Sequence, residues 1–196
     1  PVNRLSIGIQ SFSDEDLKFL NRIHNSSDAI RSVKDAQEAG FKNITIDLIY
    51  GFQTLTHEQW KKNLQIAFSL RVSHISCYSL TVEPRTALAA FIKKGKMQNV
   101  DTQKSAEQFE ILMNAMRKND FIHYEISNFC KEGFYSKHNT SYWQGVYYIG
   151  LGPSAHSYNG SSRQWNVSSI QAYINAIDKN MLPFEKEILT ETQVYN

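Results

Sequence analysis

Three polar residues of this sequence, Gln10, Asp47 and Thr81, each stand at or near the end of a short aliphatic segment. A glutamine amide offers both a hydrogen-bond donor and an acceptor, and an aspartate beside it suits the hydroxyl groups of a ribose. Arg22, in the segment LNRIH, adds a guanidinium that suits a carboxylate. Gln10, Arg22 and Asp47 could together hold a zwitterionic nucleoside. On spacing alone, it is equally open that Asp47 caps a loop and Arg22 pairs at the surface.

A second group of candidates is the run HNTSYW, which contains His138, Tyr142 and Trp143. One imidazole beside two aromatic rings could form a flat apolar slot with a single nitrogen ligand. Such a slot would suit a porphyrin or another large ring. The alternative is that these aromatic residues anchor a loop.

Two further histidines have weaker contexts. His156 follows the glycine pair Gly150 and Gly152, which permits close backbone approach to a ligand but does not form a dinucleotide-binding motif. His123 precedes Glu125 by two residues, without the spacing of a known metal motif, so we assign no metal site. An alternative function is therefore an unrelated TIM-like barrel hydrolase or lyase that uses Asp47 with His123 or His156 as acid and base.

The elements that must position these residues follow from the hydrophobic pattern. We predict strands at residues 4–10, 43–47 continuing through 48–51, and 74–80, each followed by a segment with helical periodicity. Helices are predicted to begin after Ser13, Ser27, Thr56 and Asp101, and a last helix contains Ile170 and Ile177. A fourth strand is predicted at 121–126 and a short one at 147–153, with an irregular loop at 128–137.

The first two strands alternate between an aliphatic face and a face of small or polar residues. In the first strand, Ile7 and Ile9 alternate with Gly8 and Gln10. Strands and helices in this order favour parallel βαβ units, in which the chemistry gathers at the carboxyl ends of the strands. We therefore predict an α/β fold with a polar cavity inside an open or wide barrel.

Composition narrows the class of protein. The chain has 196 residues, 41% hydrophobic, and a formal net charge of +2, which suits one domain with a small appendage. Its cysteines, Cys77 and Cys130, are too far apart for a metal knot, and no segment is long and apolar enough to span a membrane. The short run Lys93-Lys94-Gly95-Lys96 indicates a solvated loop rather than a nucleic-acid site. Without a signal peptide, we expect a cytoplasmic protein.

The ends of the sequence suggest a piece of a longer protein. The chain starts with Pro1-Val2, without an initiator methionine, directly before a strand. Near its other end, Thr190 and Gln193 have the spacing of a capping box that opens a helix.

Seven segments in this order resemble one known family. They are RLSIGIQSF, LNRIH, ITIDLIYGF, YSLTVEP, YEISNF, HNTSYW and GLGPSAHSY. The sequence resembles the radical S-adenosylmethionine (SAM) proteins related to oxygen-independent coproporphyrinogen III oxidase, and more closely their heme-chaperone branch. The resemblance implies the C-terminal half of a partial (β/α) TIM-like barrel over residues 1–130, with a parallel sheet and outer helices. Residues 131–196 would form a heme-associated linker that leads to a further C-terminal domain.

The resemblance also implies cofactors. The family holds a 4Fe–4S cluster through a CxxxCxxC motif, and the cluster binds SAM and cleaves it to a radical. This sequence lacks that motif, so we expect the chain alone to be inactive. It would also leave a barrel edge uncovered, through which the chain could self-associate. The parent protein would be either an oxidase that converts propionates to vinyl groups or a carrier that passes heme to a recipient protein.

Family roles carry over to individual residues. Gln10, Arg22 and Asp47 match residues that contact SAM, and Thr81 and His156 match more loosely. The resemblance associates His138, Tyr142 and Trp143 with heme. We assign no catalytic residue.

Overall fold

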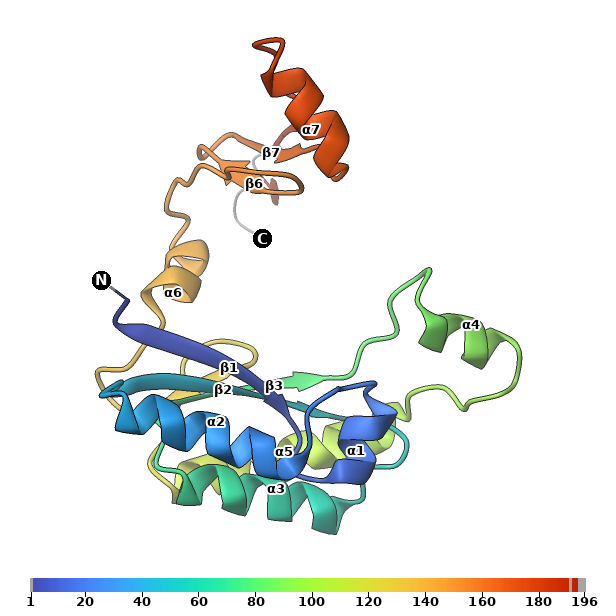
Figure 1. Ribbon diagram of the computed structural model, residues 1–196, viewed down its shortest axis with the longest axis vertical. Coiled ribbons are helices and arrows are strands. Elements are labelled where there is room, and N and C mark those ends of the chain that lie inside the picture. The colour runs from blue at the N-terminus through green and yellow to red at the C-terminus, as the bar shows by residue number, and fades with distance from the viewer. Residues whose placement is uncertain (1, 191, 194–196) are drawn as a thin grey trace. The chain divides into compact units, whose positions relative to one another are not determined.

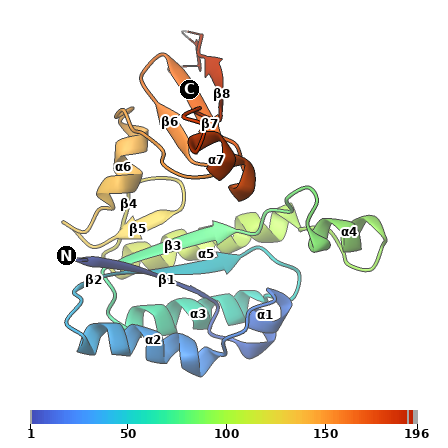
Figure 2. The ribbon, with the colours of Figure 1, turned by 45° about the horizontal axis from the view of Figure 1, so that its top comes forward.

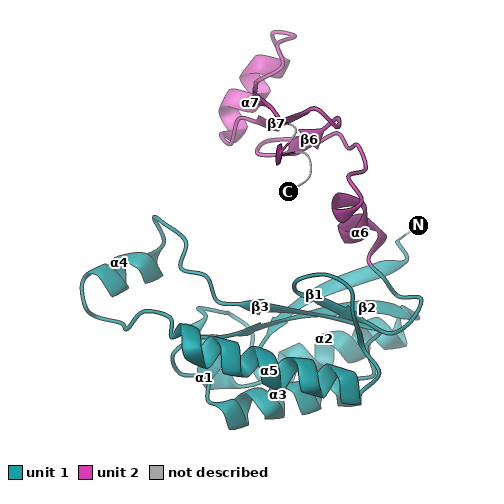
Figure 3. Ribbon diagram, turned by 180° about the vertical axis from the view of Figure 1, so that it is seen from behind, with its two compact units in different colours: residues 1–135 teal, residues 136–196 magenta. Residues whose placement is uncertain are grey.

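A computed structural model describes residues 2–190, 192 and 193 of the chain. The chain divides into two compact units, residues 1–135 and 136–196, which are coloured separately in Figure 3. The residues predicted to contact SAM, apart from His156, lie in the first unit, and those associated with heme lie in the second.

The first unit is a five-stranded sheet with helices on one face (Figures 1 and 2). Its strands are β1 (Arg4–Gln10), β2 (Asn43–Tyr50), β3 (His74–Ser79), β4 (Ile122–His123) and β5 (Asn128–Cys130). Its helices are α1 (Asp14–Phe19), α2 (Ser26–Glu38), α3 (His57–Ser69), α4 (Ala87–Lys93) and α5 (Thr102–Lys118). The strand order is β1-β2-β3-β5-β4, and β1, β2 and β3 are parallel, as the βαβ pattern predicts.

Local capping fixes where the helices begin. Ser13, Thr56 and Asp101 cap α1, α3 and α5 as predicted, because each side chain accepts a hydrogen bond from a backbone N–H in the first turn. The prediction for α2 was wrong by two residues. Asn25, not Ser27, caps this helix, and it forms a reciprocal capping box with Asp28.

The core lies between the sheet and the helices α2, α3 and α5 (Figure 1). Burial of each large aliphatic side chain there contributes roughly 1.5–3 kcal/mol. The aliphatic face of the strands therefore fixes which side the helices cover and leaves the polar face outside this core. The central members of the core are Ile46, Leu48, Ile75, Trp60, Leu64 and Leu112.

The last part of the sheet differs from the sequence prediction. Only Ile122 and His123 of the predicted strand at 121–126 form β4, and the chain then turns back into β5 within the segment predicted as loop. β5 runs antiparallel to β3. Antiparallel pairing needs only a short turn, so these strands lack the long alternating pattern that announces a strand in the sequence.

The second unit carries a small antiparallel sheet that the sequence analysis missed. It contains α6 (Lys137–Trp143), β6 (His156–Tyr158), β7 (Ser162–Asn166), α7 (Ile170–Ile177) and β8 (Phe184–Ile188), with sheet order β6-β7-β8. The strand predicted at 147–153 is wrong; only an isolated bridge between Tyr148 and Tyr158 forms. Gly152, with a φ of +100°, bends the chain after Tyr148. The last predicted helix is confirmed as α7, and Thr190 and Gln193 make the predicted capping-box hydrogen bonds.

Candidate functional site

The face of the sheet opposite the helices carries a row of polar side chains. Asp47 on β2 pairs in register with Ser76 on β3, and Ser76 pairs with Asn128 on β5. Ser76 donates a hydrogen bond of 2.6 Å to Asn128 Oδ1. Because side chains alternate between the two faces of a sheet, all three project from the same side.

Gln10 reaches this face by an unusual backbone conformation. The register of β1 against β2 slips between Ile7 and Gln10, and Gln10 has a φ of +68°, which is rare for a residue with a side chain. A Cβ atom at Gly8 would lie only 2.7 Å from Nε2 of Gln10. The Gln10 amide therefore folds back over Gly8, on the side to which a residue 8 side chain would point.

Ile7 on β1 and Ile46 on β2 are register partners. Gly8 comes directly after Ile7 and Asp47 directly after Ile46, so Gly8 and Asp47 also point to one face of the sheet. The amide of Gln10 and the carboxylate of Asp47 thus share one face, on neighbouring strands. The backbone at Gln10 is strained, and such conformations persist where the surrounding structure holds them.

Asp47 is placed differently from the prediction in one respect. The strand continues three residues past it to Tyr50, so Asp47 lies inside β2 rather than at its tip. Partial burial raises the pKa of its carboxyl group, and hydrogen bonds from Ser76 and Ser6 oppose that rise. A carboxylate whose charge is only partly compensated by protein groups is suited to accept hydrogen bonds from a ligand.

Arg22 and Thr81 lie on loops at the same end of the sheet. Arg22 is exposed in the loop between α1 and α2, where His24 Nε2 donates to the Ile9 carbonyl oxygen at 3.0 Å and ties the loop to the end of β1. Thr81 is exposed, two residues beyond the end of β3. Both residues therefore follow strand carboxyl ends, as the sequence predicts for a shared ligand site.

Replacement of Gly8 by alanine tests the arrangement around Gln10. The added methyl group would displace the Gln10 amide, while the flexible end of that side chain can move at little cost to the fold. We expect Gly8→Ala to change the free energy of unfolding by less than about 1 kcal/mol but to weaken binding of SAM roughly tenfold, the effect of one lost polar contact.

Equilibrium dialysis with labelled SAM measures the binding in that experiment, and chemical denaturation measures the stability. Gly133→Ala is a control for glycine replacement, because an added Cβ there meets no atom within 4 Å, although its φ of +80° adds some strain. Equal SAM binding by wild type and Gly8→Ala would contradict a role for the Gln10 amide.

The structure does not bring together Asp47 and His123, the alternative acid–base pair that lies within the first unit. Phe129 pairs in register with Ile75 and His123, and the His123 ring stacks on Phe129 with centroids 4.4 Å apart. Phe129 and Ile75 belong to the core under the helices. His123 therefore lies on the opposite face of the sheet from Asp47, which removes the physical basis for that pair.

The heme candidates lie on one short helix of the second unit, α6. His138 and Tyr142 are one turn apart, with His138 Nε2 and Tyr142 Oη separated by 3.1 Å and their rings edge to face. Tyr142 in turn contacts the Tyr148 ring at 4.9 Å between centroids. Trp143 is 61% exposed at the end of the helix. The run HNTSYW thus forms a helix with edge-to-face aromatic contacts rather than a loop.

His156 begins β6 in the second unit, where its ring lies 6.2 Å from that of Trp165. It is exposed and belongs to a different unit from Gln10, Arg22 and Asp47. Its role in binding SAM stays a prediction.

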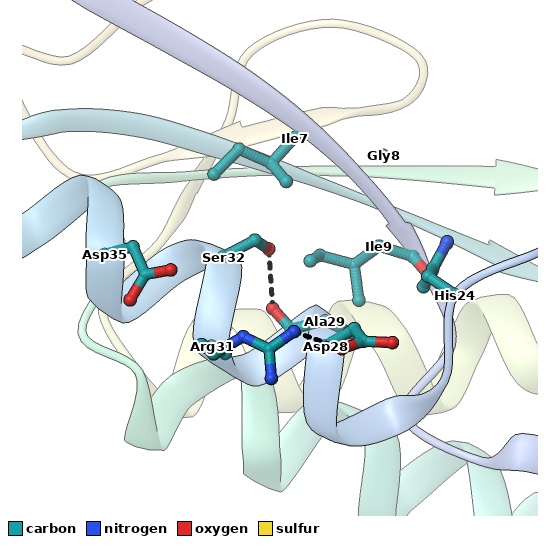
Figure 4. Close-up of a pocket in the computed structure, with 9 residues that line it drawn as sticks. All are labelled: Ile7, Gly8, Ile9, His24, Asp28, Ala29, Arg31, Ser32 and Asp35. Carbon is teal, nitrogen blue, oxygen red and sulfur yellow. Dashed lines mark hydrogen bonds and ion pairs between the residues drawn. The ribbon is translucent and has the colours of Figure 1, made fainter.

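A cavity of about 380 Å³ lies between β1 and α2, and Figure 4 shows its lining. Ile7, Ile9 and Ala29 supply its apolar wall, and Asp28 with its ion-pair partner Arg31 borders it. Because Ile7 and Ile9 belong to the helix-facing side of β1, this cavity is separate from the face that carries Asp47.

Sequence reasoning missed part of the polar face. Arg4 donates hydrogen bonds to Thr45 Oγ1 at 2.6 Å and Asn43 Oδ1 at 2.9 Å, and His74 Nε2 lies 2.8 Å from Tyr124 Oη. The signal was available for the four strand residues, since they alternate with aliphatic residues of the same strands: Arg4, Asn43, Thr45 and His74.

Comparisons with known proteins agree with this geometry. Residues 1–67 match the family described as the radical SAM superfamily. The chain is 39% identical over 98% of its length to the heme chaperone HemW of Bacillus subtilis and 36% identical over 97% to that of Lactococcus lactis. The solved structure of coproporphyrinogen III oxidase (HemN), a radical SAM enzyme of Escherichia coli, superposes on 96% of the chain with a TM-score of 0.76 at 20% identity.

The chain is similar over nearly its whole length to radical SAM proteins of the HemN and HemW type. It spans 52% of the Bacillus HemW and 46% of the HemN chain. The predicted fold class is confirmed at this level: a mixed α/β unit with a parallel-rich sheet that corresponds to part of the HemN fold. In the residues that the structure describes, no helix is long and apolar enough to cross a membrane.

The radical SAM family uses SAM and a 4Fe–4S cluster, and only the first fits the residues of this chain. A polar face with a partly compensated carboxylate suits a zwitterionic nucleoside. The cluster needs three thiolates, but the sequence has only Cys77 and Cys130, both buried in strands. Burial raises the pKa of both thiols, that of Cys130 to about 11. This chain does not supply a cluster site.

Proposed function

We propose that the first unit provides part of the SAM site of a HemW-like protein. Support comes from the family and from one observation: the Gln10 amide and the Asp47 carboxylate share a face on neighbouring parallel strands. In this proposal Asp47 accepts hydrogen bonds from the ribose hydroxyls of SAM and Gln10 binds a second polar group of the cofactor. Arg22 pairs with the methionine carboxylate and Thr81 makes a further contact, while a role for His156 stays a prediction of the family resemblance.

Bound SAM would supply the radical chemistry of the family when it meets a reduced cluster held by other cysteines. The residues of this chain would orient the nucleoside. No residue of the chain is assigned to the chemical step.

We further propose that the parent protein carries heme rather than oxidises a porphyrinogen. The heme-chaperone names of the two bacterial relatives favour carriage. His138 would offer an imidazole nitrogen to the iron, and Tyr142 and Trp143 would contact the macrocycle. The Tyr142 contact with His138 Nε2 would have to open or shift for that nitrogen to bind iron. A heme-recipient protein and a cytoplasmic location belong to the same proposal.

Anaerobic assay of the parent protein with coproporphyrinogen separates the two activities. Heme binding without conversion of propionates supports carriage, whereas formation of vinyl product supports the oxidase and contradicts our choice. The β1 edge of the sheet is the surface through which we expect the isolated chain to self-associate, which the dependence of its sedimentation on concentration would reveal.

Asp47→Asn tests the SAM site with two measurements, because it should weaken SAM binding and at the same time stabilise the fold. Loss of the carboxylate should weaken SAM binding at least tenfold, because a charge-assisted hydrogen bond is lost. The same change should stabilise the fold by about 1 kcal/mol at neutral pH, since a partly buried charge is removed. A raised pKa means that the carboxyl group favours the folded state when protonated and that this benefit is lost as pH rises. The stabilisation should therefore shrink as pH falls through the raised pKa and be lost below about pH 4, the usual pKa of an aspartate.

Equilibrium dialysis and denaturant unfolding at several pH values measure these effects. Asp35→Asn removes an exposed carboxylate from α2 and serves as the control, with both quantities expected to stay unchanged. Full SAM binding by Asp47→Asn would rule out the proposed site, even if the fold were stabilised.

A further inference from the structure

A groove of about 510 Å³ runs between α3 and α5, which lie side by side in the first unit (Figure 3). Each helix lines it with four residues at the spacing i, i+3, i+4 and i+7, so that they form one stripe along the helix. The stripe of α3 contains Lys61, Leu64, Gln65 and Phe68, and that of α5 contains Ile111, Asn114, Ala115 and Lys118. The groove is separate from the cavity in Figure 4.

The two stripes run in the same direction. α3 connects the parallel strands β2 and β3, and α5 returns from β3 to β4, so both helices run back along the sheet. At one end of the groove, Trp60 Nε1 donates to a backbone carbonyl oxygen of α5 at 2.9 Å. At the other, the Phe68 ring lies 5.7 Å from that of Phe121, just after α5. Lys61 follows Trp60 and Lys118 ends α5, so the two lysines lie at opposite ends of the groove.

Between the lysines the floor of the groove is apolar. Leu64 is buried, and Phe68, Ile111 and Ala115 are half-buried and pack against the core. The floor is therefore a depression into which the side chains of another helix can pack, as ridges pack into grooves. Insertion into a lipid bilayer needs the opposite shape, with apolar side chains that protrude.

The charge of the groove is positive. Lys61 and Lys118 are exposed, and among the residues that the structure describes neither has an ion-pair partner. Lys131 adds a third cation near the Lys118 end, where its Nζ donates to the Asn119 carbonyl oxygen. No acidic side chain lines the groove. Two acidic residues are sequence neighbours of lining residues but do not line it themselves: Glu110 and Asp120.

We propose that this groove docks an amphipathic helix of a partner protein that carries two carboxylates about two turns apart. Its apolar face would pack onto Phe68 and Ile111, and its carboxylates would pair with Lys61 and Lys118. Seven residues of helix rise about 10 Å, which is also the length of each lining stripe, so carboxylates at i and i+7 match the groove. The proposal does not depend on SAM or heme, since the groove is formed by the helices and Asp47 lies on the other face of the sheet.

A defined peptide tests the docking. It is a terminally blocked helix former about four turns long, with leucines at i, i+3, i+4 and i+7 and two glutamates seven residues apart beside them. Anisotropy of a dye on the peptide reports binding to the 196-residue chain. Replacement of the peptide's leucines by serine should weaken binding at least tenfold. A proline in its centre, which breaks the helix, should do the same.

Charge reversal in the protein tests the two lysines. Lys61→Glu and Lys118→Glu should each weaken peptide binding roughly three- to tenfold at low salt and less at high salt. The double variant should reject the glutamate peptide and prefer a peptide with lysine in place of both glutamates. This reversal of preference is the most specific result, because loss of folding would abolish binding of both peptides.

Matched controls reverse lysines that do not line the groove. Lys62→Glu lies next to Lys61 on α3, and Lys34→Glu lies on α2, and both residues are exposed. Both variants should bind the peptide like the wild type, although their net charge equals that of the test variants. Circular dichroism of all four single variants should match the wild type, and their SAM binding should be unchanged.

Saturable binding that follows this pattern supports the docking site. No saturable binding by the wild type would overturn it, as would equal losses in Lys62→Glu and Lys61→Glu, which would indicate attraction by net charge alone. Displacement of the peptide by phosphatidylglycerol vesicles would also overturn it, in favour of a membrane surface as the occupant. SAM binding measured on the same proteins reports separately on the proposed SAM site.

Discussion

Replacing Gln108 by leucine should lower the free energy of unfolding of the first unit by roughly 3–5 kcal/mol, because it leaves two buried backbone groups without partners. Gln108 lies on α5 and is fully buried. Its Oε1 accepts from the Gly51 N–H at 2.8 Å, and its Nε2 donates to the Leu55 carbonyl oxygen at 2.9 Å. One side chain therefore holds both ends of the loop that follows β2.

The backbone of the same residue completes the arrangement, since the Gln108 carbonyl oxygen accepts from Trp60 Nε1 at 2.9 Å. Leucine keeps this bond and nearly the same volume, so the loss reports on the amide alone. Gln108→Glu keeps an acceptor for Gly51 but loses the donor to Leu55, and should also be strongly destabilised because its charge would be buried.

Denaturant unfolding followed by Trp60 fluorescence measures the effect. Trp143 and Trp165 belong to the second unit, so replacing both by phenylalanine confines the signal to the first. Gln103→Leu, on the exposed face of α5, is the matched control and should change stability by no more than about 0.5 kcal/mol. A loss below about 1 kcal/mol in Gln108→Leu would contradict the proposed role of the amide.

Acidification should destabilise the first unit through His74. This residue is 1% exposed, and burial, reinforced by the nearby Arg4 guanidinium, lowers the pKa of its imidazole to about 3. In the unfolded chain the imidazole takes up a proton near pH 6.5. Between these values the unfolded state binds more protons, so stability falls with decreasing pH by up to about 1.4 kcal/mol per unit.

His74→Gln should remove this contribution, because an amide can still bond to Tyr124 Oη but does not titrate. The measurement is the difference in unfolding free energy between wild type and variant from pH 7 to pH 4. That difference cancels the contributions of Asp47 and the other carboxyl groups. His57→Gln changes an imidazole at the start of α3 and should leave the acid dependence in place. A variant as acid-sensitive as the wild type would refute the assignment to His74.

The parallel part of the fold could be predicted because each strand carries its own signal. β1 was predicted at its observed bounds, since aliphatic residues alternate with small or polar ones from Arg4 to Gln10. β2 was predicted with its continuation past Asp47, although that continuation moves Asp47 away from the strand tip. The family resemblance, confirmed by the comparisons, is the basis for placing the candidate SAM residues at the carboxyl ends of these strands, and that placement stays a prediction.

The details of the site could not be predicted, because they depend on how strands pair. The slip in register after Ile7 and the left-handed backbone at Gln10 turn its amide over Gly8, and neither leaves a mark in the residue pattern. The same holds for β4 and β5, which are too short to show alternation. In the second unit, the strand residues do not alternate cleanly, so the small sheet escaped notice.

The strand order determines on which side a further parallel strand could join the sheet. Beyond β3 the sheet ends in two short antiparallel strands, whereas β1 offers seven residues along an open side. A polypeptide segment that extends the sheet in parallel would join β1 and deliver the turn at its own carboxyl end beside Gln10. Residues of such a segment that contact a shared ligand would therefore approach it from the Gln10 side. Asp47 and Ser76 would then form the opposite wall of the ligand site.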